Sequence, residues 1–161
     1  MAENLFAKFN EMFDTAAIAK DVKESSAGNV ERKEVPYGDY EVRITKLELG
    51  ECTFDGEYKG MPEAHVWFRI IGDGEYAGQM LFMNKRLVSV KNPSANGFIL
   101  HRFNEFLESL EADTPVVFEN FEQYGHLIET IFNEIDGRAE YQLAFFDNRG
   151  YKDYAIVKRF V

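Results

Sequence analysis

The order of two hydrophobic periodicities limits the folds open to this chain of 161 residues. Apolar and polar residues alternate in three successive segments, as in half-buried β-strands. Apolar residues then recur at helical spacing in two segments, and strict alternation returns in the last two. The predicted elements are a strand through Tyr40 and Leu49, strands 63–71 and 79–90, helices at 98–110 and from Asn120 to Asp136, and strands 138–146 and 151–161.

The first strand contains a change of parity. Val42 and Ile44 share one face of a regular strand, whereas Leu47 and Leu49 would lie on the other face. This predicts a β-bulge near residues 45–46, which would let a long strand bend. Five strands with helical material between the third and the fourth follow the order of an OB-fold barrel. We therefore predict a mainly β (α+β) domain built as an OB-fold-like five-stranded barrel, and a small open α+β sheet is the alternative.

The segment before this domain has a different character. Residues 1–20 place apolar side chains at three- and four-residue spacing and predict an amphipathic helix. Residues 21–34 are polar, without periodicity, and predict a linker to a domain over residues 35–161. The apolar stripe of the helix is expected to dock on its own domain, on a second copy or on another protein.

Composition indicates the compartment. The N-terminus lacks the basic and continuous apolar regions of a secretory signal, and no apolar run reaches the length of a membrane span. Cys52 is the only cysteine, which excludes an internal disulfide and fits a reducing cytoplasm. We therefore expect a cytoplasmic protein.

The negative charge is unevenly distributed. The net charge is −10, but residues 97–137 alone hold nine acidic residues against one basic residue. The predicted strands are together close to neutral. Because binding depends on the local field, overall acidity does not exclude a nucleic-acid partner. The acidic helices are expected to form a solvated face, which would also repel nucleic acid or attract basic partners.

The second strand suggests a binding surface. His65, Trp67 and Arg69 alternate with the core positions and should project away from the core. OB barrels bind ligands on the outer face of strands 2 and 3, between the loops that join strands 1 and 2 and strands 4 and 5. The candidate nucleic-acid-binding residues on these elements are Arg43, Phe54, Tyr58, Lys59, His65, Trp67, Arg69, Lys85, Arg86, Arg149, Tyr151 and Lys152.

Aromatic faces and cations together suit single-stranded nucleic acid, which stacks its bases and needs partners for its phosphates. We expect these residues to form a cationic trough. Lys85 and Arg86 are adjacent, so only one of them can line it if the strand is regular. The alternative for Trp67 is burial in a second small core beneath the N-terminal helix.

Enzyme chemistry has little support in the sequence. Cys52, His65, His101 and His126 share no metal-ligand spacing. We find no P-loop, dinucleotide fingerprint or nucleophile elbow. We therefore expect no catalytic residues, no metal and no cofactor.

Several runs together resemble a known family. They are PYGDYEVRITKLELGE, KGMPEAHVWFRIIGDGEYAGQMLFMNKRL, GFILHRFNEFLESL and IFNEIDGRAEYQLAFFDNRGYKDYAIVKRF. They resemble a family of small phage and prophage proteins, a domain of unknown function found among replication and recombination genes and suspected to supply single-stranded DNA-binding proteins. The resemblance covers about residues 36–161. It implies a phage origin, the bacterial host cytoplasm, and no catalytic residues.

Three functions follow from these observations. The leading one is a single-stranded DNA-binding protein of phage replication or recombination, with a phage recombinase or replication protein as a further partner and a homodimer as one oligomeric state. The second is a protein-interaction or assembly module, and the third is an acidic mimic of nucleic acid. The sequence leaves open whether RNA competes with DNA.

Overall fold

The computed structural model describes residues 7–8, 12, 14, 16–18 and 32–161. Residues 1–32 and 33–161 form two separate units. In the first unit, the described residues other than Asp14 and Arg32 are helical, and the Asp14 Oδ1 atom accepts a hydrogen bond from the Ala17 amide at 3.1 Å. The rest of the predicted N-terminal helix, and the predicted linker up to residue 31, lie outside the described residues.

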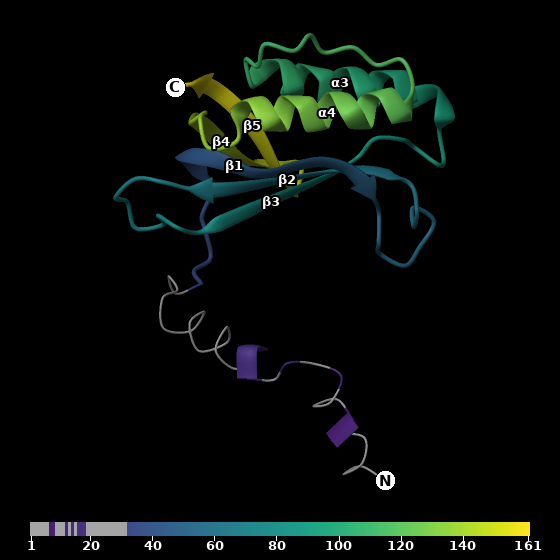
Figure 1. The fold of residues 1–161 in the computed structure, drawn as a ribbon. Helices are drawn as coiled ribbons and strands as arrows, with labels where there is room; N and C mark the ends of the chain where they lie inside the picture. Colours follow the sequence, from purple (N-terminus) through teal and green to yellow (C-terminus); the bar gives the residue numbers. More distant parts are fainter. Residues whose placement is uncertain (1–6, 9–11, 13, 15, 19–31) are drawn as a thin grey trace. The chain divides into compact units, whose positions relative to one another are not determined.

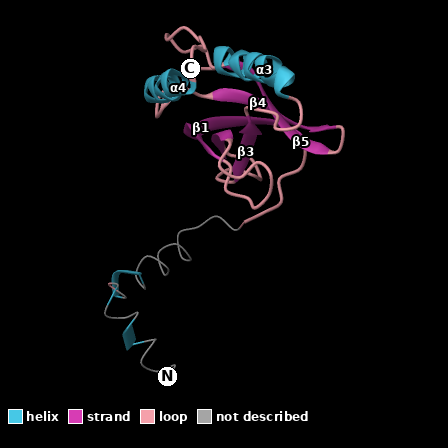
Figure 2. Cartoon of the chain, turned by 90° about the vertical axis from the view of Figure 1, so that its right-hand side faces the viewer, coloured by secondary structure: helices cyan, strands magenta, loops and turns pink. Residues whose placement is uncertain are grey.

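The second unit contains five strands, two α-helices and one short 3₁₀-helix. A helical layer lies over one face of the sheet, and a view turned by 90° shows the same two layers (Figures 1 and 2). The elements are β1 (Gly38–Glu51), β2 (Pro62–Ile70), β3 (Met80–Arg86), η1 (Pro93–Ala95), α3 (Asn96–Ser109), α4 (Phe121–Ile135), β4 (Tyr141–Asn148) and β5 (Tyr151–Arg159).

The five strands form one antiparallel sheet in the order β3-β2-β1-β4-β5. The predicted bulge is confirmed, because the pairing of β1 with β2 shifts between Ile44 and Lys46. Residues 38–42 of β1 pair with β4, and the longer part of the strand, residues 42–51, pairs with β2. The long first strand thus serves both halves of the sheet.

The mainly β class with added helices is confirmed, but the closed barrel is not found. β3 and β5 are the two edge strands and do not pair with each other, so the sheet is open. Aromatic side chains lie between the sheet and α3: Phe68 of β2 stacks on Tyr154 of β5 at 5.6 Å and meets Phe106 of α3 at 6.4 Å, centroid to centroid. Closing the barrel would require these rings to move.

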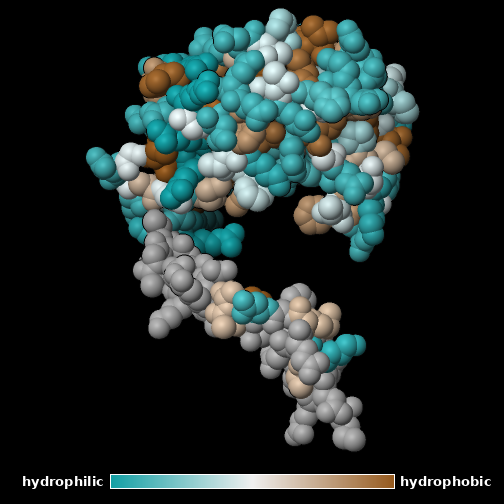
Figure 3. Space-filling model, in the orientation of Figure 1, coloured by the Kyte–Doolittle hydropathy of each residue, from teal (hydrophilic) through white to brown (hydrophobic). Residues whose placement is uncertain are grey.

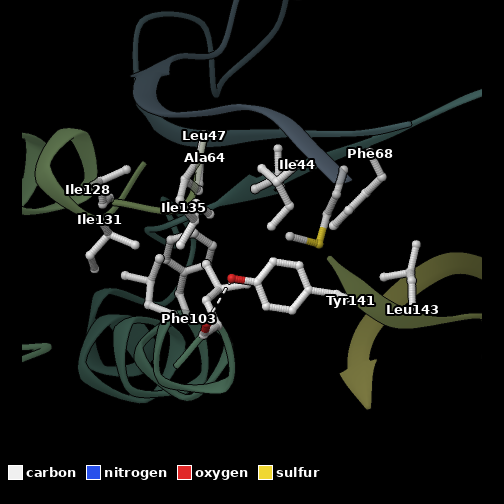
Figure 4. Close-up of a cluster of buried hydrophobic side chains, with 14 of the residues drawn as sticks. Ile44, Leu47, Ala64, Phe68, Phe103, Ile128, Ile131, Ile135, Tyr141 and Leu143 are labelled. Atoms are coloured by element: carbon white, nitrogen blue, oxygen red, sulfur yellow. Dashed lines mark hydrogen bonds between the residues drawn. The ribbon is translucent and has the colours of Figure 1, made fainter. Parts of the chain in front are cut away.

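The core lies between the sheet and the helices. Most inward apolar residues of β1 to β4 are buried, and α4 contributes Ile128, Ile131 and Ile135 (Figure 4). Tyr141 is fully buried there, and its hydroxyl donates a hydrogen bond of 2.8 Å to the Leu110 carbonyl. Burial raises the pKa of Tyr141 to about 12.

Local signals set most of the element ends. The Asn120 side chain accepts a hydrogen bond from the Gln123 amide at 2.8 Å, as the capping pattern predicts. β3 ends at Arg86, several residues before the predicted end at residue 90. The turn before η1 is held instead by side chains, since Asn96 accepts from the Ser89 amide at 2.7 Å. Among the described residues no helix is both long and apolar enough to cross a membrane.

Candidate nucleic-acid interface

The sheet face that points away from the helices carries the residues singled out on the second strand. We call this side of β1, β2 and β3 the outer face. Val66 and Phe68 are fully buried toward the helices, whereas Trp67 and Arg69 are exposed on the outer face and His65 is half-buried. The alternation of β2 therefore places its three candidate residues as predicted. The side chain of Trp67 is 37% exposed. The alternative of its burial beneath the N-terminal helix concerns a segment that lies largely outside the described residues.

An aromatic pair lies at the centre of the outer face. Trp67 and Phe82 are directly opposite each other on β2 and β3, and their rings meet edge to face at 5.3 Å. Phe82 is 43% exposed. The Lys46 ammonium lies 4.3 Å from the centre of the Trp67 ring, in the geometry of a cation–π contact. Two exposed aromatic faces thus lie beside a fixed cation.

The loop between β1 and β2 reaches the other end of β3. The Arg86 guanidinium lies 4.1 Å from the centre of the Tyr58 ring. Lys59 is held by Asp55 at 3.1 Å, and Phe54 is 71% exposed in the same loop. The structure therefore joins Tyr58 to the outer face through Arg86, and it leaves Phe54 without a described ring or cation partner.

His65 lies between two carboxylates. Its Nε2 atom is 2.9 Å from Oε1 of the buried Glu63, and its Nδ1 atom is 3.3 Å from Oε1 of Glu48. Lys46 also contacts Glu48, at 3.2 Å. Burial acts to raise the pKa of Glu48, but the hydrogen bonds from His65 and Lys46 outweigh it and lower this pKa below its usual value. His65 is therefore committed to an internal network.

Two arginines lie side by side at the other end of the outer face. Arg43 and Arg69 are directly paired across β1 and β2. They line a hollow of about 500 Å³ together with Thr45 and the turns after β2 and α4. Arg43 is bound to Glu140 at 2.6 Å, whereas Arg69 has no carboxylate partner within the described part of the chain. Arg69 is the more available of the two for an anion.

The remaining candidates lie off this face. Lys85 has the inward parity of β3 and forms an ion pair of 2.9 Å with Asp153 of β5. Arg86 lines the outer face and Lys85 does not, so only one of these two adjacent residues lines it, as predicted. Exposed side chains occupy the tip of the hairpin between β4 and β5 and contact none of the central residues among the described contacts; they are Arg149, Tyr151 and Lys152.

The charge on the outer face is mixed, and the expectation of a uniformly cationic trough is not met. Glu48 and Glu63 lie within the same surface as Lys46 and Arg69. The opposite layer is more acidic, as the sequence indicates. In the view of Figure 3 the surface over α3 and α4 is mostly hydrophilic, with a few apolar patches.

Sequence reasoning missed Lys46 and Phe82. Phe82 has the same outward parity as Arg86, so the alternation of β3 was sufficient to find it. Lys46 faces outward only because the bulge shifts the register after Ile44. Its place was thus implied by the bulge and by the inward parity of Leu47.

Over the described ranges, no group of three or more His, Cys, Asp or Glu side chains is arranged to hold a metal ion. His101 and His126 are exposed on the helices and contact Glu105 at 3.0 Å and Glu129 at 3.6 Å.

The comparisons with known proteins leave the family open. No family model and no curated protein matches this chain.

Proposed function

We propose that this chain is a single-stranded DNA-binding protein that uses its outer face, and that it acts without catalysis. The observation that carries the proposal is the pair of exposed rings, Trp67 and Phe82, with Lys46 fixed against the indole. Stacking on such rings is tolerant of sequence, since every base has a π face. Arg69 and Arg86 flank the pair along the same side and supply partners for phosphates.

We propose an OB-type fold together with this function. We interpret the strand order β3-β2-β1-β4-β5 as that of an OB-type sheet opened between β3 and β5, and OB folds bind along strands 2 and 3. With the resemblance to phage replication and recombination proteins, this supports a role in the cytoplasm of a bacterial host. A protein-interaction module is the second candidate, because Glu48 and Glu63 partly neutralise the outer face.

Fluorescence anisotropy with labelled oligo-dT at two salt concentrations tests the proposal. If Lys46, Arg69 and Arg86 each neutralise one phosphate, log K should fall with log salt at a slope of about −2. Trp67 is the only tryptophan, so its own fluorescence should be quenched on binding. Trp67→Ala removes one stacking platform and should weaken binding about tenfold or more.

The chain offers a matched control. Phe160 is 42% exposed, as Phe82 is 43% exposed, and it lies under Lys158 at 5.1 Å, much as Trp67 lies under Lys46. Phe82→Ala should weaken DNA binding, whereas Phe160→Ala should not. Absence of binding at low salt, or equal losses in both variants, would refute the proposal and favour the interaction module.

A further inference from the structure

The two sheet edges face each other across a cavity. β3 and β5 are unpaired with one another, and a cavity of about 480 Å³ lies between them and α3. The Lys85–Asp153 ion pair of 2.9 Å joins the two edges across this space. Aromatic side chains of α3, including Phe103 and Phe106, form an apolar wall. The cavity is distinct from the outer face, which it meets only at Arg86.

Residues of both edge strands, β3 and β5, line this cavity. Its lining includes Met83, Lys85 and Arg86 of β3, Leu87 just after that strand, and four consecutive residues of β5, 153–156. Neighbouring residues of a strand point to opposite faces. Because the cavity touches every residue of the β5 run, it faces the edge of β5, where unpaired N–H and C=O groups lie. β3, which also lines the cavity, is the other edge strand of the sheet.

The strand directions define what fits between these edges. All four strand pairs are antiparallel, so β3 and β5, at the two ends of a five-stranded sheet, run in the same direction. One added strand running the opposite way would pair antiparallel with both edges. Such a strand needs about 4.8 Å on each side. A sixth strand would thus complete an alternating, closed sheet.

The charges around the cavity indicate the side chains of that strand. Arg86 and Arg102 both line it, and neither has a carboxylate partner in the described part of the chain. Guanidinium groups favour carboxylates through paired hydrogen bonds. Phe98 and Phe146 are 63% and 37% exposed at the same cavity and offer contacts to an apolar side chain. A nucleic-acid strand would use the arginines but would leave both rows of backbone groups unpaired.

We propose that the gap between β3 and β5 is a docking site for an extended peptide segment of a partner protein. The segment adds as a strand antiparallel to both edges. It places an aromatic or large aliphatic side chain against α3, and its acidic residues lie at Arg86 and Arg102. This mode of recognition takes affinity from main-chain hydrogen bonds and specificity from side-chain pockets. It shares only Arg86 with the outer face that is proposed to bind DNA.

A panel of fluorescein-labelled heptapeptides tests the site with the full chain. Each has alternating apolar residues and a central phenylalanine, flanked on both sides by aspartate, lysine or serine. The aspartate peptides should bind, and the lysine peptides should bind at least about tenfold more weakly. Methylation of alternate backbone nitrogens should abolish binding, because it removes ladder donors without changing the side chains.

Protein variants provide the second arm. Arg102→Glu should weaken the aspartate peptides about tenfold or more and improve the lysine peptides. Arg138→Glu changes an exposed arginine outside the cavity and should have no effect. Peptide binding should also slow hydrogen exchange of amides in both β3 and β5.

Four results would each overturn the proposal. They are no binding by any peptide, equal binding of the methylated peptides, indifference to Arg102→Glu, and displacement of the peptides by oligo-dT that persists in the Arg86→Ala variant. The last would assign the cavity to nucleic acid. Sedimentation that shows a dimer broken by Arg102→Glu, with no peptide binding, would instead assign it to a second copy of the chain.

Discussion

Replacing Gly50 with alanine tests how tightly the His65 network is built. Gly50 lies on β1 beside the His65 ring, and a Cβ atom there would lie 2.8 Å from Cε1 and 2.9 Å from Nδ1 of that ring. The neighbour cannot simply swing aside, because its two nitrogens are held by Glu63 and Glu48. The alanine therefore displaces an imidazole that is fixed at both ends.

The expected loss of stability follows from the hydrogen bonds that the displaced His65 ring no longer makes to Glu63 and Glu48. Hydrogen bonds to charged groups contribute roughly 1.5–3 kcal/mol each, and a buried charge without its partner costs more. Glu63 is only 6% exposed, so it cannot recover its lost bond from water. Glu48 is more exposed and can. We expect Gly50→Ala to lower the free energy of unfolding by about 2–3 kcal/mol.

Urea denaturation followed by circular dichroism measures this value, and two further variants interpret it. Gly97 lies in α3 with no atom near its missing Cβ, so Gly97→Ala should be neutral or stabilise by up to about 1 kcal/mol. In a His65→Ala background there is no ring to meet, so adding Gly50→Ala should cost little. The steric reasoning is wrong if the Gly50→Ala cost persists there, or if both glycine variants behave alike.

Two further predictions concern buried polar groups. Tyr141→Phe should lower the free energy of unfolding by about 1–2 kcal/mol, because it leaves the buried Leu110 carbonyl without its donor. The Tyr124 hydroxyl donates to a half-exposed side-chain amide, so Tyr124→Phe should lower this free energy less in the same urea titration. Burial acts to raise the pKa of Asp153, but hydrogen bonds, the first from Lys85, outweigh it and lower this pKa below the usual 3.8. Because the folded-state pKa is lowered, Asp153 stabilises the fold above the unfolded pKa of about 3.9, and this contribution is lost as pH falls through the folded value. Asp153→Asn should therefore be less stable than the parent chain near neutral pH, and the difference in free energy of unfolding should shrink as pH falls below about 3.9. A difference that stays constant with pH would contradict this assignment.

Periodicity predicted the elements and their order because each strand and helix buries one face. The parity switch in β1 placed the bulge correctly, since Ile44 and Leu47 both have to reach the core. The capping pair Asn120 and Gln123 placed the start of α4. These features depend on local spacing alone.

The closure of the sheet could not be predicted in this way. Whether β3 meets β5 depends on the side chains between the sheet and α3, where Phe68, Phe106 and Tyr154 pack together. The same limit applies to the site. Arg43 and Lys59 have the residue type of phosphate partners, but each is held by a carboxylate. Arg43 is bound to Glu140, which is 97 residues away in the sequence, and Lys59 is bound to Asp55 in the same loop.

The bulge links the fold to the proposed binding surface. Arg43 and Lys46 are three residues apart, a spacing that puts side chains on opposite faces of a regular strand. The register shift after Ile44 brings both to the outer face and keeps Leu47 in the core. Without it, Lys46 would point into the core and Trp67 would lose its cation. One extra residue in β1 therefore decides both how the sheet bends and which charge lies beside the indole, so the two properties cannot change independently.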